Sequence, residues 1–206
     1  MILKFDHMAY SCTKNNFGDT FERFSKYRQL FYDHNLPNLD IKRPLMKGWC
    51  DTHDISLLNC DGSVPIEITA YDTVHPGGKY EINGNTIIVN TRSLEESIKF
   101  YQSIGFKFDG DVSCKLKPVM DNEAITLVFQ LVNVDIDYAL NSLGYCCLAF
   151  ITNDVNKERL KIKGKMIEVT EVMSLCVNEQ PLDIFFAYNE YGDICEFISL
   201  KREKIQ

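Results

Sequence analysis

Two carboxylates and an imidazole stand in apolar, strand-like segments, where a charged group needs a partner. Glu67 lies between two isoleucines, and Glu196 lies between a cysteine and a phenylalanine. A carboxylate that points into the covered face of a sheet is costly unless it is paired or bound to a cation. His7 lies in a similar segment, and histidine is the commonest metal ligand among side chains. Imidazole nitrogen and carboxylate oxygen together suit a divalent metal ion, so these residues are candidates for a metal site.

Alternation along a strand decides which of these side chains share a face. In the strand-like segment 3–13, His7 and Ala9 point the same way, and in the segment 65–71 Glu67 does so with Thr69. The first and last strands of this region therefore offer His7 and Glu67 as a matched ligand pair. The structural alternative is a histidine that is hydrogen-bonded by its neighbour Asp6 and binds no metal.

A further candidate is His53, in the polar segment Trp49–Asp54 just before an apolar strand. An imidazole with a pKa near neutrality can act as a general acid or base. His53 and Glu67 are therefore the candidate catalytic residues. A histidine in a loop exposed to water is the alternative interpretation of His53.

The elements that must position these residues repeat along the chain. Residues 85–91 are rich in β-branched side chains and predict a strand. Ser93 and Glu96 predict a capping box at the start of the helix that follows, and Gly105 is placed to end it. The same order of elements occurs twice more, with a first helix expected from about Asp19 to Phe31. We predict three βαβββ modules, over residues 1–72, 84–133 and 144–201.

Three features of these modules carry a family resemblance: the strand-to-helix passage Ile87–Phe106, the closing hairpin Tyr188–Phe197, and the pair Phe5–Tyr10 and Pro65–Thr69. Together they resemble the vicinal oxygen chelate superfamily, which includes glyoxalase I, methylmalonyl-CoA epimerase, extradiol dioxygenases and bleomycin resistance proteins. The resemblance implies an α+β fold in which repeated βαβββ modules form cupped mixed β-sheets with helices on the outer face. It also implies a divalent metal in the cup, held by the first and last strands of the modules.

The resemblance places candidate ligands at two positions in each module. These are His7 and Glu67, then Thr86 and Gln130, then Cys147 and Glu196. Only the first module has both strong ligands, and a cysteine such as Cys147 is more often part of a core than reactive. The predicted metal ligands are therefore His7, Glu67 and Glu196. The predicted cofactor is a divalent metal ion, with zinc, nickel, iron and manganese all possible.

Modules of this kind work in pairs, so three modules leave one without a partner. The contiguous segment 84–201 favours a domain made of the second and third modules, beside a separate unit over 1–72. The first module would then pair with a second copy of the chain in a homodimer. Alternatively, the first module meets the third in a rearranged sheet, which would unite His7, Glu67 and Glu196. The sequence leaves both arrangements open.

Composition excludes several classes of protein. The chain has 206 residues, of which 45% are hydrophobic, and its formal net charge is -7. This balance is that of a globular protein with a real core, and the acidic excess disfavours a nucleic-acid partner. No stretch reaches the ~20 apolar residues of a membrane span, and the N-terminal segment lacks the apolar run of a secretory signal. We therefore expect a cytoplasmic protein.

Cysteines and motifs narrow the chemistry further. The 8 cysteines include no CxxC pair, and several lie in apolar runs, so reduced thiols are expected. The chain has no phosphate-binding loop, no dinucleotide fingerprint, no HExxH and no GxSxG. Nucleotide hydrolysis, dinucleotide redox chemistry and serine hydrolysis therefore lose support.

The leading hypothesis is a metal-dependent enzyme of the vicinal-oxygen-chelate type that acts on a small oxygenated metabolite. Isomerase, lyase and ring-cleaving dioxygenase chemistry all agree with metal chelation of neighbouring oxygens. The alternative is a metal-free protein that binds a small molecule or sequesters an antibiotic, as the bleomycin-resistance branch does. A scaffold built from degenerate modules is a third possibility.

Overall fold

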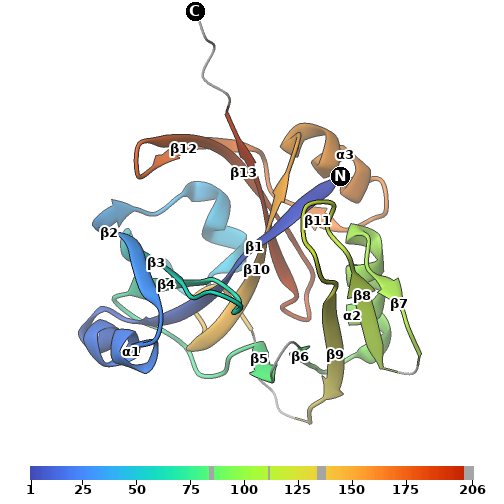
Figure 1. Cartoon of the computed structure of the whole chain (residues 1–206), viewed down its shortest axis with the longest axis horizontal. Coiled ribbons are helices and arrows are strands. Elements are labelled where there is room, and N and C mark those ends of the chain that lie inside the picture. Colours follow the sequence, from blue (N-terminus) through green and yellow to red (C-terminus); the bar gives the residue numbers. More distant parts are fainter. Residues whose placement is uncertain (84–85, 111, 134–137, 202–206) are drawn as a thin grey trace, which may run out of the picture.

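The computed structural model describes residues 1–83, 86–110, 112–133 and 138–201 (Figure 1). The first module contains β1 (Ile2–Thr13), the 3-10 helix η1 (Lys14–Asn16), α1 (Phe17–Arg23), β2 (Arg28–Pro37), η2 (Asp40–Leu45), β3 (Thr52–Asn59) and β4 (Ile66–Tyr71). The second contains β5 (Tyr80–Asn83), β6 (Thr86–Thr91), α2 (Leu94–Ile104), β7 (Lys107–Phe108), β8 (Ser113–Leu116) and β9 (Ile125–Leu131). The third contains β10 (Gly144–Thr152), α3 (Val155–Lys163), β11 (Glu168–Val169), β12 (Met173–Val177), β13 (Gln180–Tyr188) and β14 (Ile194–Leu200). The predicted α+β fold of βαβββ modules is confirmed.

Local sequence explains the boundaries of the helices. Ser93 caps α2 by accepting a hydrogen bond from the backbone N–H of Glu96, and Gly105 ends the helix with a φ of 116°. Both positions are those predicted from the sequence. The capping box is only half formed, because the Ser93 N–H donates to Thr91 Oγ1 and Glu96 pairs with Lys99. The first helix is shorter than predicted, because α1 ends at Arg23 and residues 28–37 form a strand that pairs with β3. Phe24 is therefore the C-cap of α1, whereas Phe31 lies in β2.

The centre of the molecule is an antiparallel ladder between β1 and β10. Met8 lies opposite Leu148. On the two sides of this pair, His7 lies opposite Ala149 and Ala9 lies opposite Cys147. Strand β4 runs parallel to β1 on its other edge, and β14 runs parallel to β10. The first and third modules thus share one cupped sheet, which is the rearranged arrangement considered above. The division into units 1–72 and 84–201 stays a prediction, and this ladder crosses its boundary.

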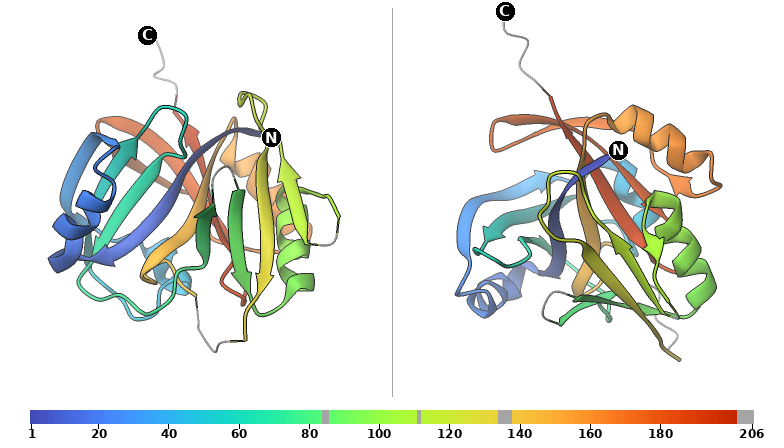
Figure 2. Two further views of the ribbon diagram at one scale, coloured as in Figure 1. Left: turned by 60° about the horizontal axis from the view of Figure 1, so that its bottom comes forward. Right: turned by 45° about the vertical axis from the view of Figure 1, so that its right-hand side comes forward.

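Alternation along β1 and β10 separates the two faces of the cup. Met8 and Phe150 point outward into an apolar cluster that also contains Phe100 of α2 and Val155 of α3. The views in Figure 2 show α2 and α3 on this outer side of the sheet. The opposite face carries another cluster, with Ala9 and Cys147 among its buried members. No helix among the described residues is long and apolar enough to cross a membrane.

The second module joins the cup through β5. This short strand pairs with β6 along one edge and meets β10 through a pair between Tyr80 and Tyr145. Strand β6 therefore lies between β5 and β9, and the edge that another module would use is already filled. Filling an edge in this way removes a row of unpaired backbone groups.

A buried ion pair fastens the second module to the third. Lys79 Nζ lies 3.0 Å from Asp193 Oδ1, and the two side chains are 1% and 0% exposed. Lys79 also donates to the carbonyl oxygen of Tyr191. Asp193 accepts hydrogen bonds from Ser97 of α2 and from Asn189 of the β13–β14 hairpin. Burial lowers the pKa of Lys79 while the charge of Asp193 opposes that change, so each charge depends on the other.

We expect Asp193→Ala to destabilise the fold strongly, because it leaves the Lys79 ammonium buried without its counter-charge. Breaking a buried ion pair typically costs about 3–5 kcal/mol. Urea titration followed by circular dichroism would measure the change in the free energy of unfolding. The control is Lys99→Ala, which removes an exposed lysine that pairs with Glu95 and Glu96. Similar stabilities for the two variants would show that the buried pair does not fasten the modules.

Candidate functional site

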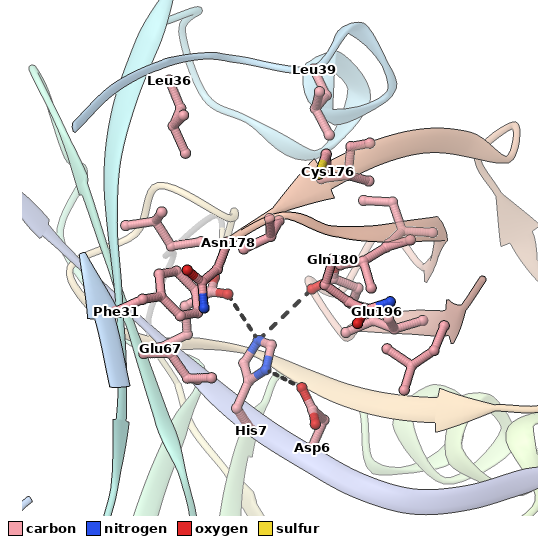
Figure 3. Close-up of a pocket in the computed structure, with 18 of the residues that line it drawn as sticks. Asp6, His7, Phe31, Leu36, Leu39, Glu67, Cys176, Asn178, Gln180 and Glu196 are labelled. Carbon is pink, nitrogen blue, oxygen red and sulfur yellow. Dashed lines mark hydrogen bonds and ion pairs between the residues drawn. The ribbon is translucent and has the colours of Figure 1, made fainter. Parts of the chain in front are cut away.

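The β1–β10 ladder and its flanking strands bring three candidate ligands to one place. His7 comes from β1, Glu67 from β4 and Glu196 from β14, and Figure 3 shows their side chains converging on one cavity. His7 Nε2 lies 3.4 Å from an oxygen of Glu67 and 3.9 Å from an oxygen of Glu196. The imidazole is 4% exposed, and the two carboxylates are 16% and 14% exposed. The residues predicted to bind metal therefore lie together, and metal binding itself stays a prediction.

The local two-fold relation between the modules explains why both carboxylates face the imidazole. Ala9 lies opposite Glu67 across the β1–β4 ladder, and Ala149 lies opposite Glu196 across the β10–β14 ladder. The two glutamates are thus equivalent positions of the first and third modules. By the same relation, the counterpart of His7 is a cysteine at position 147, which is buried.

Asp6 orients the imidazole. Its carboxylate lies 2.9 Å from His7 Nδ1, which places the proton on that nitrogen and turns Nε2 toward Glu67 and Glu196. Burial raises the pKa of Asp6, but the hydrogen bond and charge of His7 outweigh it, and the pKa falls below its usual value. His7 Nε2 is buried and has no hydrogen-bond partner among the described residues. A carboxylate behind a histidine is the usual support of a metal-ligating imidazole.

The charges of the cluster shift its proton equilibria. Burial lowers the pKa of His7, but the charges of Glu67, Asp6 and Glu196 outweigh this effect and raise it to about 9. Burial and the neighbouring charge of Glu67 raise the pKa of Glu196 to about 7. Without a bound cation, His7 is therefore an imidazolium held among carboxylates. A divalent cation at Nε2 has to displace that proton.

The donor atoms fit a divalent ion. Two ligand atoms about 2.1 Å from one ion lie roughly 3.4 Å apart at a tetrahedral angle, which matches the 3.4 Å between His7 Nε2 and Glu67. Within the described residues, no three His, Cys, Asp or Glu side chains already surround one point as a metal cluster. Glu196, at 3.9 Å from Nε2, therefore has to turn toward the ion if it is to be the third ligand.

The cluster forms the floor of a cavity of about 510 Å³. This volume is ordinary for a site that binds a small organic molecule. The walls come from β2, β3, β13 and β14, and η2 and the β12–β13 hairpin reach over the opening (Figures 1 and 3). The walls are mainly apolar, as the following lining residues illustrate: Phe31, Leu36, Ile55, Leu57, Leu182 and Ile198.

His53 lines the same cavity from β3 and is buried, so the alternative of a water-exposed loop histidine is wrong. Burial and the charges of Lys42 and Lys14 lower the pKa of His53 to about 3. The imidazole is therefore neutral near pH 7 and is a weak base. Its Nδ1 is buried without a hydrogen-bond partner among the described residues. A neutral ring with a free nitrogen suits hydrogen bonding to a ligand, and a catalytic role stays a prediction.

The register of the second module corrects one candidate. Thr86 precedes the N-cap Ser93 by the same interval that separates Cys147 from its own N-cap, Asp154. Strand β6 pairs with β9 so that Ile88 faces Val128, which makes a valine the counterpart of Glu67 and Glu196. The expected position Gln130 pairs with Asn90 instead. The second module therefore offers threonine and valine where the others offer ligands.

Sequence reasoning missed the residues that shape the cavity. Phe31 and Leu36 lie on β2, whereas a helix was expected as far as Phe31. Lys42, Asn178 and Gln180 also line the cavity. The run Leu30–Tyr32, with its two aromatic residues, was the available signal for a strand. Nothing local indicates that η2 and the β12–β13 hairpin reach the same opening.

Comparison with known proteins gives a likeness of fold. No family model matches the sequence, and a search of curated proteins finds no match. Methylmalonyl-CoA epimerase from Mycobacterium tuberculosis matches with a TM-score of 0.46 at 10% identity, over 98% of this chain and 91% of that chain. Glyoxalase I from Zea mays matches with a TM-score of 0.39 at 15% identity, over 95% of this chain and 67% of that chain.

A hypothetical protein from Bacillus halodurans matches with a TM-score of 0.46 at 12% identity, over 98% of this chain and 97% of that chain. At such identities a likeness concerns the fold alone, and the fold described above rests on the strand ladders themselves. The epimerase and the glyoxalase are proteins of the kind to which the sequence pointed.

Proposed function

We propose that this chain is a vicinal-oxygen-chelate-like metalloprotein that acts on a small oxygenated metabolite. His7, Glu67 and Glu196 would hold one divalent ion, with zinc, nickel, iron and manganese as the candidates. The observation that carries the proposal is a buried imidazole nitrogen that makes no hydrogen bond within the described residues and faces two carboxylates on the floor of an apolar cavity. Isomerase, lyase and dioxygenase chemistry are the reaction classes that this arrangement supports.

Each part of the site has a proposed role. A bound ion supplies a Lewis acid that can take two neighbouring oxygens of the substrate. Asp6 fixes the ring of His7 and keeps Nε2 directed at the ligand position. The apolar walls exclude water and strengthen the electrostatic interactions inside the cavity. Glu67 is the carboxylate proposed to take a proton from the substrate, and His53 is proposed to hydrogen-bond one of its oxygens.

A metal-free binding protein is the second candidate, and one observation favours it. With its pKa raised to about 9, His7 is an imidazolium at neutral pH and offsets part of the negative charge of the neighbouring carboxylates. The floor of the cavity therefore already holds a positive charge without a metal. In this case the cavity would hold or sequester an apolar small molecule and do no chemistry on it.

We further propose a cytoplasmic location and a small-molecule partner. The homodimer stays a prediction that has lost its original reason, because β1 pairs with β10 of the same chain and not with a second copy. The edge of β6 is also filled, by β5. Light scattering at micromolar concentration would measure the mass directly.

We expect wild-type protein to bind about one divalent ion per chain after supplementation with manganese, iron, nickel or zinc. His7→Ala, Glu67→Gln and Glu196→Gln each remove a donor and are expected to weaken binding by about 100-fold or more. Elemental analysis after desalting, followed by titration calorimetry, measures both quantities. His34→Ala, an exposed histidine on β2, is the matched control. Wild-type protein that takes up none of these metals would leave the metal-free binding protein as the function.

We expect metal affinity to rise with pH, because the ion competes with the proton on His7. Between the pKa of Glu196 at about 7 and that of His7 at about 9, displacement of one proton gives about a tenfold gain in affinity per pH unit. Below pH 7 protonation of Glu196 adds to the competition, and above pH 9 the gain ends. Manganese titration from pH 6.5 to 8.5 in buffers of different ionisation enthalpy would count the released protons.

The Asp6→Asn variant tests the cause of this pH dependence. It removes one of the charges that raise the pKa of His7, so its affinity is expected to level off at a lower pH than that of wild type. If the metal affinity of both proteins is independent of pH, the ion does not displace a proton from His7.

A further inference from the structure

Two polar side chains of the cavity wall lack a partner and are not among the proposed metal ligands. Lys42, on η2, lines the cavity and makes no ion pair or side-chain hydrogen bond within the described residues. His53, on β3, has a buried Nδ1 without a hydrogen-bond partner in the same part of the chain. A buried polar atom without a partner costs free energy, so the His53 ring is better satisfied when a ligand occupies the cavity. Lys42 is partly exposed and can offer its ammonium to the same ligand.

The two groups act at the same part of the cavity. Both side chains line the one cavity, and burial, with the charge of Lys42 second to it, lowers the pKa of His53 and keeps the imidazole neutral. A neutral imidazole offers one N–H donor, and the ammonium of Lys42 offers three. Together they present donors and one positive charge, which is the complement of a carboxylate.

The other charges that face the cavity fix where an anion can lie. Asp6, Glu67 and Glu196 are carboxylates at the floor, and they repel an anion from that end. Lys42 lines the same cavity from η2 and forms no ion pair with these carboxylates within the described residues. The ammonium therefore still has its donors available. The apolar walls between them suit a hydrocarbon or aromatic body.

We propose that the cavity binds an apolar organic acid, with its carboxylate on Lys42 and His53 and its apolar body along β2, β3 and β13. The inference rests on the proposed function, because the organic acid would occupy the cavity whose floor carries the proposed metal ligands. It adds the class of ligand.

The test compares two probes that share a body and differ in their head group. Chelator-treated protein at pH 7.5 is titrated by calorimetry with 4-phenylbutanoate and with 4-phenylbutan-1-ol. We expect wild type to bind the acid about tenfold more tightly than the alcohol, as suits a charge-assisted hydrogen bond. Lys42→Met should abolish this preference by weakening binding of the acid more than binding of the alcohol, while Lys42→Arg should keep most of it.

Arg43→Met is the matched control. Arg43 is the next residue on η2, but it is exposed, pairs with Asp40 and stacks on Trp49, and does not line the cavity. This variant loses the same charge and should keep the preference for the acid. Equal binding of acid and alcohol by wild type, or a preference that survives in Lys42→Met, would overturn the inference.

The use of metal-free protein separates this inference from the proposed function. A preference for the acid in a protein that takes up no metal supports the organic-acid site and refutes the metalloenzyme. Uptake of one ion per chain with no preference for the acid supports the metalloenzyme and refutes the organic-acid site. A thermal melt of each variant shows that it is folded before it is titrated.

Discussion

The antiparallel ladder between β1 and β10 is the constraint on which the rest of the site depends. It sets Met8 against Leu148 and thereby relates the first and third modules by a local two-fold axis. The flanking parallel strands then deliver Glu67 and Glu196 from opposite sides to one imidazole. Because side chains alternate along a strand, a register slip of one residue would turn His7 toward the helices and Met8 into the cavity. The register of β1 on β10 therefore decides which side chains face the cavity.

Local patterns in the sequence predicted the parts of the site that lie within one module. Alternation placed His7 and Glu67 on one face, and a carboxylate in an apolar strand marked Glu196. The capping residues Ser93 and Glu96 gave the start of α2 correctly. What the sequence left open was the choice of partner for β1, because that choice depends on contacts between distant segments. The sequence did not predict that Lys42 lines the cavity, for the same reason. Its position follows from the path of η2 and not from its neighbours in sequence.

The second module has no partner module in the cup, yet it is joined to the rest of the sheet. Strand β5 covers the edge of β6, and the buried pair of Lys79 and Asp193 holds the module against the third one. At the positions equivalent to His7 and Glu67 it has Thr86 and Val128, and a valine offers no ligand atom. Its contribution is to support the cup from outside. The proposed metal site lies in the two modules that face each other across the β1–β10 ladder.

The long separation between the halves of the cup has a consequence for how the protein is made. Cys146 of β10 contacts the backbone of Ala9 although they are 137 positions apart in the chain. During synthesis β1 and β4 emerge well before β10 and β14, so one edge of β1 stays without its neighbour while the second module is translated. Folds dominated by such distant contacts form slowly, and unpaired strand edges promote aggregation. The set of His7, Glu67 and Glu196 is complete only when β14 joins the sheet, so a chain that ends before β14 lacks the third of these residues.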